Sequence, residues 1–252
     1  MNFEQGVYTV IPTYFKDRDI DMESIFNVIR YQINNSIKNI VLLGTTSETS
    51  TLTQEDKNMI VTNVWNEFNH KINIIVGIGT NNTKTTLENA FIFREYCHAF
   101  MVTVPYYNKP SQEGIYQHFA TIAQLIADKS IMIYNIPSRC GVSIEPITVA
   151  NLYNNFDNIK AIKEASGSIQ QTMEIIQLCQ INIFSGDDAL LLPSMSVGAK
   201  GVVSVASNII PNEINNIIKL FNNGNIKEAI DINNKLFPFL KSLFVDTNPI
   251  PI

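Results

Sequence analysis

One lysine gives the sequence its clearest chemical signal. Lys163 ends the apolar run Ile159–Lys163, and the alternation of a strand would place it on the same face as Ala161. In the mouth of a barrel, low-dielectric surroundings would disfavour the charged form of this lysine. A neutral amine can attack a ketone and form an imine. The alternative is a rim lysine that forms an ion pair with Glu164 or another carboxylate.

Hydroxyl groups and a guanidinium follow other apolar runs. Tyr134 ends a neighbouring run, where its phenol could shuttle protons during imine formation or simply be a core aromatic. Thr45 and Thr46 offer hydroxyls and backbone N–H groups to a carboxylate, although a plain turn would use the same residues. Arg139 has the bidentate geometry that suits a second carboxylate, but surface arginines are common. The convergence of these groups on one rim is hard to explain by packing alone.

Eight short β-branched runs would position these groups. Continuous apolar runs without clean alternation are typical of parallel strands buried on both faces. Helix-length stretches separate them, which predicts an α/β fold, a (β/α)8 TIM barrel with its chemistry at the carboxyl ends of the strands. An open doubly wound sheet is the competing architecture, but no G-x-G-x-x-G follows the first run. The runs are Val7–Ile11, Asn39–Leu43, Ile72–Gly77, Phe100–Val104, Ile131–Tyr134, Ile159–Lys163, Ile181–Ser185 and Gly201–Val205.

Helix boundaries can also be predicted. Thr53 and Asp56 form an acidic variant of the capping box, and Ser111 precedes a run with helical spacing. Pro146 and Pro211 suit the first turn of a helix. After the last strand we expect helices near Asn212–Asn222 and Ile226–Leu243, then a proline-containing tail. We therefore assign residues 1–223 to the barrel and 224–252 to a C-terminal helical extension.

Composition narrows the class of function. The 252 residues carry a formal charge of −5 and no Lys/Arg block, which argues against a nucleic-acid partner. Neither a signal peptide nor a membrane span is apparent, so we expect a cytoplasmic protein. The cysteines and histidines are too scattered for a disulfide frame or a metal site. Asp187 and Asp188 could suggest acid–base catalysis, but capping of the next helix is the preferred interpretation.

The motifs resemble the dihydrodipicolinate synthase branch of the dihydrodipicolinate synthase/N-acetylneuraminate lyase superfamily. The resemblance covers nearly the whole chain, in the order of the family. It is carried by GTTSETSTL at 44–52, VPYYNKPSQEGIYQHF at 104–119, YNIPSRCG at 134–141, KEASG at 163–167, SGDDALLLPSMSVGAKGVVSV at 185–205 and TNPIPI at 247–252.

The resemblance implies a role for each site residue. Lys163 would form an imine with pyruvate, and no cofactor would be needed. Tyr134 and Thr45 would relay protons together with Tyr107, which the family supplies across a subunit interface of a homodimer or homotetramer. The substrate-binding residues would be Thr46 for the pyruvate carboxylate, Gly186 and Val203 for the pyruvate pocket, and Arg139 for the carboxylate of L-aspartate 4-semialdehyde.

The implied reaction condenses pyruvate with this aldehyde to give 4-hydroxy-tetrahydrodipicolinate, for lysine or diaminopimelate synthesis. Thr45 and Arg139 favour the synthase over N-acetylneuraminate lyases, which usually have serine at the first position and lack the arginine. Another 2-keto-acid aldolase and a non-catalytic barrel are the alternatives.

Departures from the family pattern lead to further expectations. Ser47 replaces a usual glycine, which would cost about 1 kcal/mol if that position needs a positive φ. Cys140 replaces a threonine and could alter solvent access, and relatives continue past Ile252, which leaves tetramer assembly in question.

At the regulatory lysine site of the family, the counterparts are Ser50, Gln54, Lys57, Asn81, Thr85 and Tyr106. Because Lys57 would repel a lysine ligand, we predict weak or absent feedback inhibition.

Overall fold

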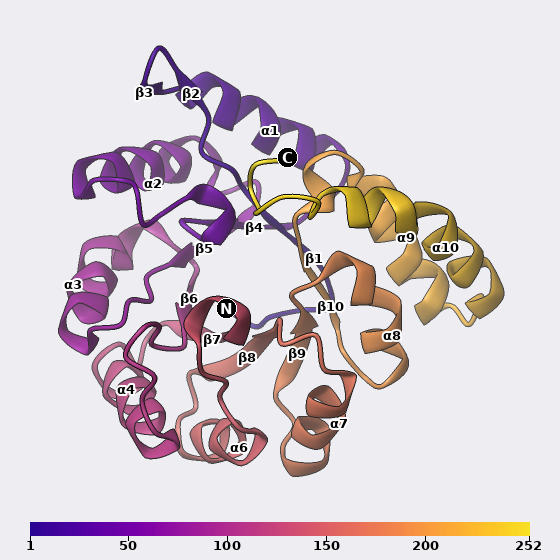
Figure 1. Cartoon of the computed structure of the whole chain (residues 1–252). Coiled ribbons are helices and arrows are strands. Elements are labelled where there is room, and N and C mark those ends of the chain that lie inside the picture. The colour runs from indigo at the N-terminus through magenta and orange to yellow at the C-terminus, as the bar shows by residue number, and fades with distance from the viewer.

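A computed structural model describes residues 1–252. Its centre is a closed, eight-stranded parallel barrel with the strand order β1-β10-β9-β8-β7-β6-β5-β4 (Figure 1). The predicted (β/α)8 barrel is therefore confirmed, and each predicted strand end lies within one residue of the observed end. The barrel strands are β1 Gly6–Val10, β4 Asn39–Leu42, β5 Asn73–Gly77, β6 Ala99–Thr103, β7 Ser130–Asn135, β8 Ile159–Glu164, β9 Asn182–Ser185 and β10 Gly201–Ser204.

Helices form a ring around this barrel (Figure 1). They are α1 Met22–Asn34, α2 Gln54–Phe68, α3 Thr83–Phe93, α4 Gln112–Leu125, α5 Pro137–Cys140, α6 Pro146–Asn155, α7 Ile169–Leu178, α8 Leu191–Ser196, α9 Pro211–Asn222 and α10 Ile226–Ser242. Single turns of 3-10 helix occur at η1 Thr45–Ser47, η2 Arg94–Tyr96, η3 Asp188–Leu190 and η4 Ala206–Asn208. No helix is both long and apolar enough to cross a membrane.

The predicted helix starts are confirmed. Thr53 accepts a hydrogen bond from Asp56 N, and the Asp56 side chain accepts one from Thr53 N, which completes the capping box of α2. Ser111 caps α4 by accepting from Gly114 N. Pro146 and Pro211 are the first residues of α6 and α9, where a missing N–H costs nothing.

The two faces of the barrel strands pack into two different apolar clusters. A large cluster lies between strands and helices and contains Ile133, Ile159 and Ile162. A second cluster fills the barrel interior and contains Tyr8, Tyr134, Ala161, Phe184 and Val203. Strands with buried residues on both faces must present continuous apolar runs, which is why these strands were visible in the sequence.

A short hairpin after β1 was not predicted. Strands β2 Phe15–Lys16 and β3 Asp19–Ile20 pair antiparallel around Asp17 and Arg18, whose φ angles are 52° and 77°. Two residues with positive φ are required by a type I′ turn, but the usual Asn-Gly signal is absent here. Strands of two residues are also too short to show any periodicity.

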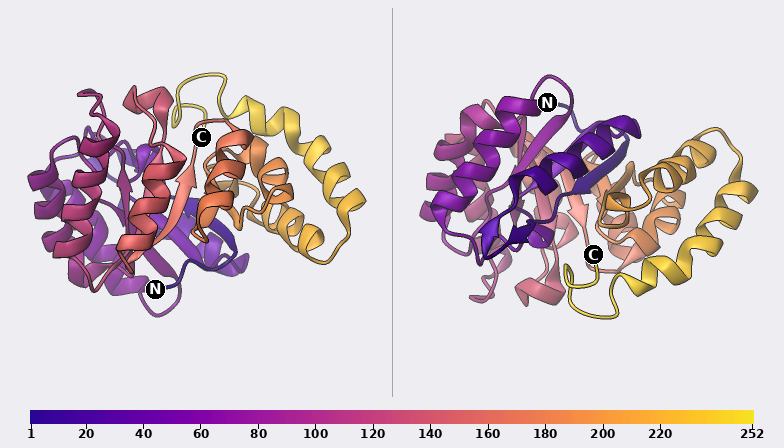
Figure 2. Two further views of the ribbon diagram at one scale, coloured as in Figure 1. Left: turned by 90° about the horizontal axis from the view of Figure 1, so that it is seen from below. Right: turned by 90° about the horizontal axis from the view of Figure 1, so that it is seen from above.

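The end of the chain returns to the barrel mouth. Helix α10 packs against α9 through Leu240 and Leu243, which join a buried cluster with Ile214 and Ile217. Residues 243–252 then run back over the end of the barrel toward which the strands point, opposite the N-terminus (Figure 2). The tail thereby becomes part of the wall of the site.

Candidate active site

Lys163 and Tyr134 lie side by side at the carboxyl ends of β8 and β7. The two residues are partners in the β7–β8 ladder. Lys163 Nζ lies 4.1 Å from the centroid of the Tyr134 ring, and the lysine is only 5% exposed. The hydroxyl of Tyr134 lies 3.4 Å from Thr45 Oγ1 in η1. The predicted lysine, phenol and hydroxyl are thus brought together in one place.

Glu164 does not pair with Lys163. Its side chain lies on the outer face of β8, where it accepts hydrogen bonds from Asn135 Nδ2, Ser166 N and Gln171 Nε2. Burial raises the pKa of this carboxyl, and the hydrogen bonds oppose that rise. The four ion pairs of the structure all lie on the surface and do not include Lys163. The alternative of a rim lysine with a carboxylate partner is therefore wrong.

A cavity of about 730 Å³ opens above this group. Its lining includes Thr45, Thr46, Tyr134, Arg139, Lys163, Gly186 and Asp187. A Cβ atom at Gly186 would lie 2.5 Å from Ala165 Cβ and 3.1 Å from Lys163 Cε, so only glycine leaves room for the lysine side chain. Val203 lies below the cavity in the apolar barrel interior. The space beside the amine is large enough for two small substrates.

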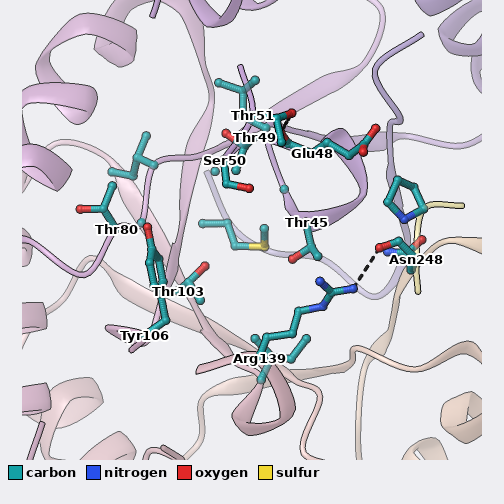
Figure 3. Close-up of a pocket in the computed structure, with 18 of the residues that line it drawn as sticks. Thr45, Glu48, Thr49, Ser50, Thr51, Thr80, Thr103, Tyr106, Arg139 and Asn248 are labelled. Atoms are coloured by element: carbon teal, nitrogen blue, oxygen red, sulfur yellow. Dashed lines mark hydrogen bonds between the residues drawn. The ribbon is translucent and has the colours of Figure 1, made fainter. Parts of the chain in front are cut away.

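Arg139 reaches the cavity from α5. Its Nη2 donates a 2.9 Å hydrogen bond to the main-chain oxygen of Asn248 in the C-terminal tail (Figure 3). Asn248 in turn donates from Nδ2 to Thr46 Oγ1 at 3.0 Å. Sequence reasoning assigned no role to Asn248, because no local pattern shows that the tail crosses the mouth. The signal that could have pointed to Asn248 is the TNPIPI segment at 247–252, which contains it and is part of the family resemblance.

Tyr107 is the predicted site residue that the single chain does not bring to the cavity. Its side chain is 85% exposed, and its φ is 69°. Its backbone N–H bonds to the oxygen of Cys140, which fixes the loop after β6. Its neighbour Tyr106 lines a second cavity instead.

Ser47 carries no conformational penalty. The positive φ angles in its loop, 54° and 52°, belong to Leu43 and Glu48, so the conditional expectation of strain at Ser47 is wrong. Ser47 Oγ donates to Ile11 O at 2.6 Å, and Thr13 Oγ1 donates to Ser47 O. Because the serine hydroxyl bonds to the end of β1, it stabilises the loop that carries Thr45.

Cys140 is enclosed by the protein. The thiol donates to Val104 O at 3.2 Å, and burial raises its pKa to about 11. A thiol in this state is a poor nucleophile. Cys140 therefore contributes packing under α5.

The two aspartates after β9 differ in role. Asp187 caps η3 by accepting from Ala189 N, as expected. Asp188 does not cap a helix. It is fully buried, accepts from Val205 N, Ala206 N and Ser204 Oγ, and has a pKa that burial raises. It ties the loop after β9 to the loop after β10, a long-range contact that its sequence position did not reveal.

A smaller cavity of about 440 Å³ lies on the β4–β6 side of the mouth. Three of the six counterparts of the regulatory lysine site, Ser50, Lys57 and Tyr106, line this cavity, and Glu48 lies in the same wall. Figure 3 labels Ser50, Tyr106 and Glu48. Gln54, Asn81 and Thr85 are not part of its wall. No group of three or more His, Cys, Asp or Glu side chains could hold a metal ion.

Comparisons with known proteins agree with this geometry. The model of the Dihydrodipicolinate synthetase family matches residues 2–252. The chain is 41% identical to the 4-hydroxy-tetrahydrodipicolinate synthase of Methanococcus vannielii, over 98% of this chain and 86% of the relative. It is 43% identical to that of Endomicrobium trichonymphae, over 98% and 85%. The crystal structure of the Thermotoga maritima dihydrodipicolinate synthase superposes with a TM-score of 0.95 at 35% identity, covering 98% of this chain and 86% of that one.

Proposed function

Because the chain belongs to the dihydrodipicolinate synthetase family, we propose that Lys163 is the amine through which it acts on pyruvate. The chain is an enzyme that condenses pyruvate with L-aspartate 4-semialdehyde to 4-hydroxy-tetrahydrodipicolinate, the product that names its relatives. The observation that carries the assignment to Lys163 is its burial beside the Tyr134 ring.

The chemistry proceeds through a covalent imine. The amine of Lys163 adds to the ketone carbon of pyruvate, and loss of water from the carbinolamine leaves the imine. The imine draws electrons from the methyl carbon, so a proton leaves and an enamine forms. The enamine carbon then bonds to the aldehyde carbon of the second substrate. The amino group of that substrate displaces Lys163 as the ring closes, which frees the lysine. The imine is itself the electron sink, so no step requires a cofactor.

The hydroxyl groups have distinct roles in this sequence. Tyr134 moves the protons of carbinolamine and enamine formation; its ring packs against the amine of Lys163, and its hydroxyl meets Thr45. Thr45 passes these protons on across the 3.4 Å contact with the Tyr134 hydroxyl. Thr46 binds the carboxylate of pyruvate, Arg139 binds that of the aldehyde, and Gly186 and Val203 shape the pyruvate pocket.

A second copy of the chain completes the relay. Tyr107 is exposed in one chain, so it can reach a neighbouring site only by crossing an interface. The working protein is accordingly a homodimer or a larger homo-oligomer. The N-acetylneuraminate lyase alternative is not favoured, because the relatives carry the synthase name.

The test is reduction of the protein with borohydride in the presence of pyruvate, followed by peptide mass mapping. We expect an adduct on Lys163 and none in a Lys163→Ala variant. Lys160→Ala is the matched control, because Lys160 lies on the same strand but outside the cavity lining, and this variant should keep the adduct. Folded protein without any adduct would favour the non-catalytic barrel. An adduct with no turnover of L-aspartate 4-semialdehyde would favour an aldolase with another partner.

A further inference from the structure

The C-terminal tail places one residue between the two carboxylate-binding groups. Asn248 donates from its side-chain amide to Thr46 Oγ1 at 3.0 Å and accepts Arg139 Nη2 at its main-chain oxygen at 2.9 Å. Thr46 belongs to η1 after β4 and Arg139 to α5 after β7, so the tail joins two separate parts of the rim. Figure 3 shows the contact between Asn248 and Arg139. Asn248 also borders both cavities.

The direction of the Thr46 contact has a chemical consequence. A threonine hydroxyl has one proton to donate and two lone pairs that accept. Because the Asn248 amide fills an acceptor site of Thr46 Oγ1, the hydroxyl proton stays available. Thr46 is 2% exposed and lines the cavity that holds Lys163, so the proton has a carboxylate of the bound substrate as its natural acceptor.

We propose that Asn248 is a positioning residue that sets Thr46 as a hydrogen-bond donor to the carboxylate of pyruvate. Its main-chain oxygen at the same time holds the Arg139 guanidinium at the rim for the second carboxylate. The inference rests on the proposed function, since it assigns a task to the pyruvate subsite of that function. The tail thus takes part in substrate recognition and is more than a cover for the barrel.

The orientation of the Asn248 amide distinguishes this role from packing. Its Oδ1 is buried and has no hydrogen-bond partner, so the residue bears a cost in this orientation. Turning the amide would let Oδ1 accept the Thr46 proton, but it would leave Nδ2 unpaired in its place. In the observed orientation the Thr46 hydroxyl can donate to the substrate, whereas in the turned orientation it would donate to Asn248 Oδ1. The two orientations therefore predict different effects of replacing Asn248 with aspartate.

The experiment compares Asn248→Ala with Asn248→Asp in steady-state kinetics. Loss of an orienting contact to a charged ligand should raise the KM for pyruvate about tenfold in Asn248→Ala, with a smaller change in kcat. Asn248→Asp should raise this KM further, because a carboxylate can only accept and would take the Thr46 proton while repelling the substrate. A packing role predicts the reverse order, since aspartate nearly matches asparagine in shape. A wild-type pyruvate KM in Asn248→Asp would overturn the inference.

A second measurement tests the route through Thr46. In a Thr46→Val background, Asn248→Ala should add little to the KM for pyruvate, whereas independent effects would add fully and contradict the proposal. Ser242→Ala, at the end of α10, is the control for changes near the tail and should behave as wild type. Thermal midpoints within about 2 °C of wild type would show that the variants are folded.

The outcomes separate the two hypotheses. A wild-type chain that forms no borohydride-reducible adduct with pyruvate would overturn the proposed function and this inference together. A wild-type chain that forms the adduct, combined with equal pyruvate KM values in all Asn248 variants, would overturn the inference alone.

Discussion

Tyr134 and Lys163 are partners across the β7–β8 ladder because the register of that ladder shifts by one residue. Ile131 pairs with Ile159, but Met132 pairs with Ala161, so Lys160 is an extra residue in β8. Ile159 accordingly packs outside the barrel while Ala161 packs inside it. An uninterrupted register would place Lys163 on the face of Ile159, away from the cavity. The bulge directs the amine toward the cavity, as bulges near active sites often do.

Replacement of Tyr134 by phenylalanine tests the proton relay. The ring would still pack beside Lys163, but the hydroxyl that meets Thr45 would be lost. We expect kcat to fall by about 10² to 10³. The pyruvate adduct on Lys163 should still form, only more slowly. Stopped-flow measurement of imine formation would check this, and unchanged rates would remove Tyr134 from the mechanism.

Replacement of Arg139 by lysine tests recognition of the aldehyde. Lysine keeps the charge but lacks the planar fork, so we expect the KM for L-aspartate 4-semialdehyde to rise about tenfold or more. Borohydride trapping of pyruvate should be unaffected, because Lys163 and Tyr134 are untouched. Arg94→Lys, at the exposed ion pair with Asp128, is the matched control and should change neither value. Equal effects on both substrates would contradict a role specific to the aldehyde.

Tyr107 should matter only in an oligomer. Its side chain is 85% exposed in one chain, and the proposed relay takes it from a second copy. We expect Tyr107→Phe to lower kcat by about tenfold to hundredfold without changing the sedimentation coefficient. Specific activity should also fall on dilution, in step with dissociation seen by analytical ultracentrifugation. A fully active monomer would argue against this role.

Free L-lysine should inhibit weakly or not at all. Lys57 lines the smaller cavity beside Ser50 and Tyr106, and its like charge opposes an incoming lysine ligand. Burial lowers the pKa of Lys57. The carboxylate in the same cavity wall that could attract the ligand is Glu48. The initial rate at increasing L-lysine concentration measures the effect. A low-micromolar inhibition constant would refute the prediction.

His118 should make the protein less stable in mild acid. Burial lowers its pKa from 6.5 to about 4, while its Nδ1 pairs with Thr83 Oγ1. The unfolded chain therefore binds the proton first, and the contribution of His118 is lost as the pH falls from about 6.5 through about 4. The loss is at most about 3 kcal/mol.

Urea unfolding at several pH values measures this dependence. His118→Phe should show a shallower loss of stability than wild type between pH 6.5 and 4, because the titrating group is gone. Thr83→Ala is the control, since it removes the hydrogen bond but keeps the imidazole. Parallel curves for wild type and His118→Phe would show that another group controls the pH dependence.

The sequence by itself determined the barrel and the identity of its chemical groups. Strands buried on both faces must be apolar throughout, and most of the helices begin with a capping side chain or a proline. Local patterns therefore revealed all eight strands, the caps at Thr53 and Ser111, and the lysine near the end of β8. The resemblance of the motifs then led to the proposal of which groups act on pyruvate.

Tertiary structure alone decided how these groups meet. The bulge at Lys160 depends on the pairing of β8 with β7, so no alternation within β8 could reveal it. Ser47 escapes strain because its loop places the positive φ angles at Leu43 and Glu48. Asp188 finds its donors at the end of β10 and just after it, 16 to 18 residues away. Asn248 lies more than 200 residues from Thr46, and only the return of the chain over the mouth joins them. Each of these contacts links segments far apart in the chain, whereas sequence patterns report the preferences of near neighbours.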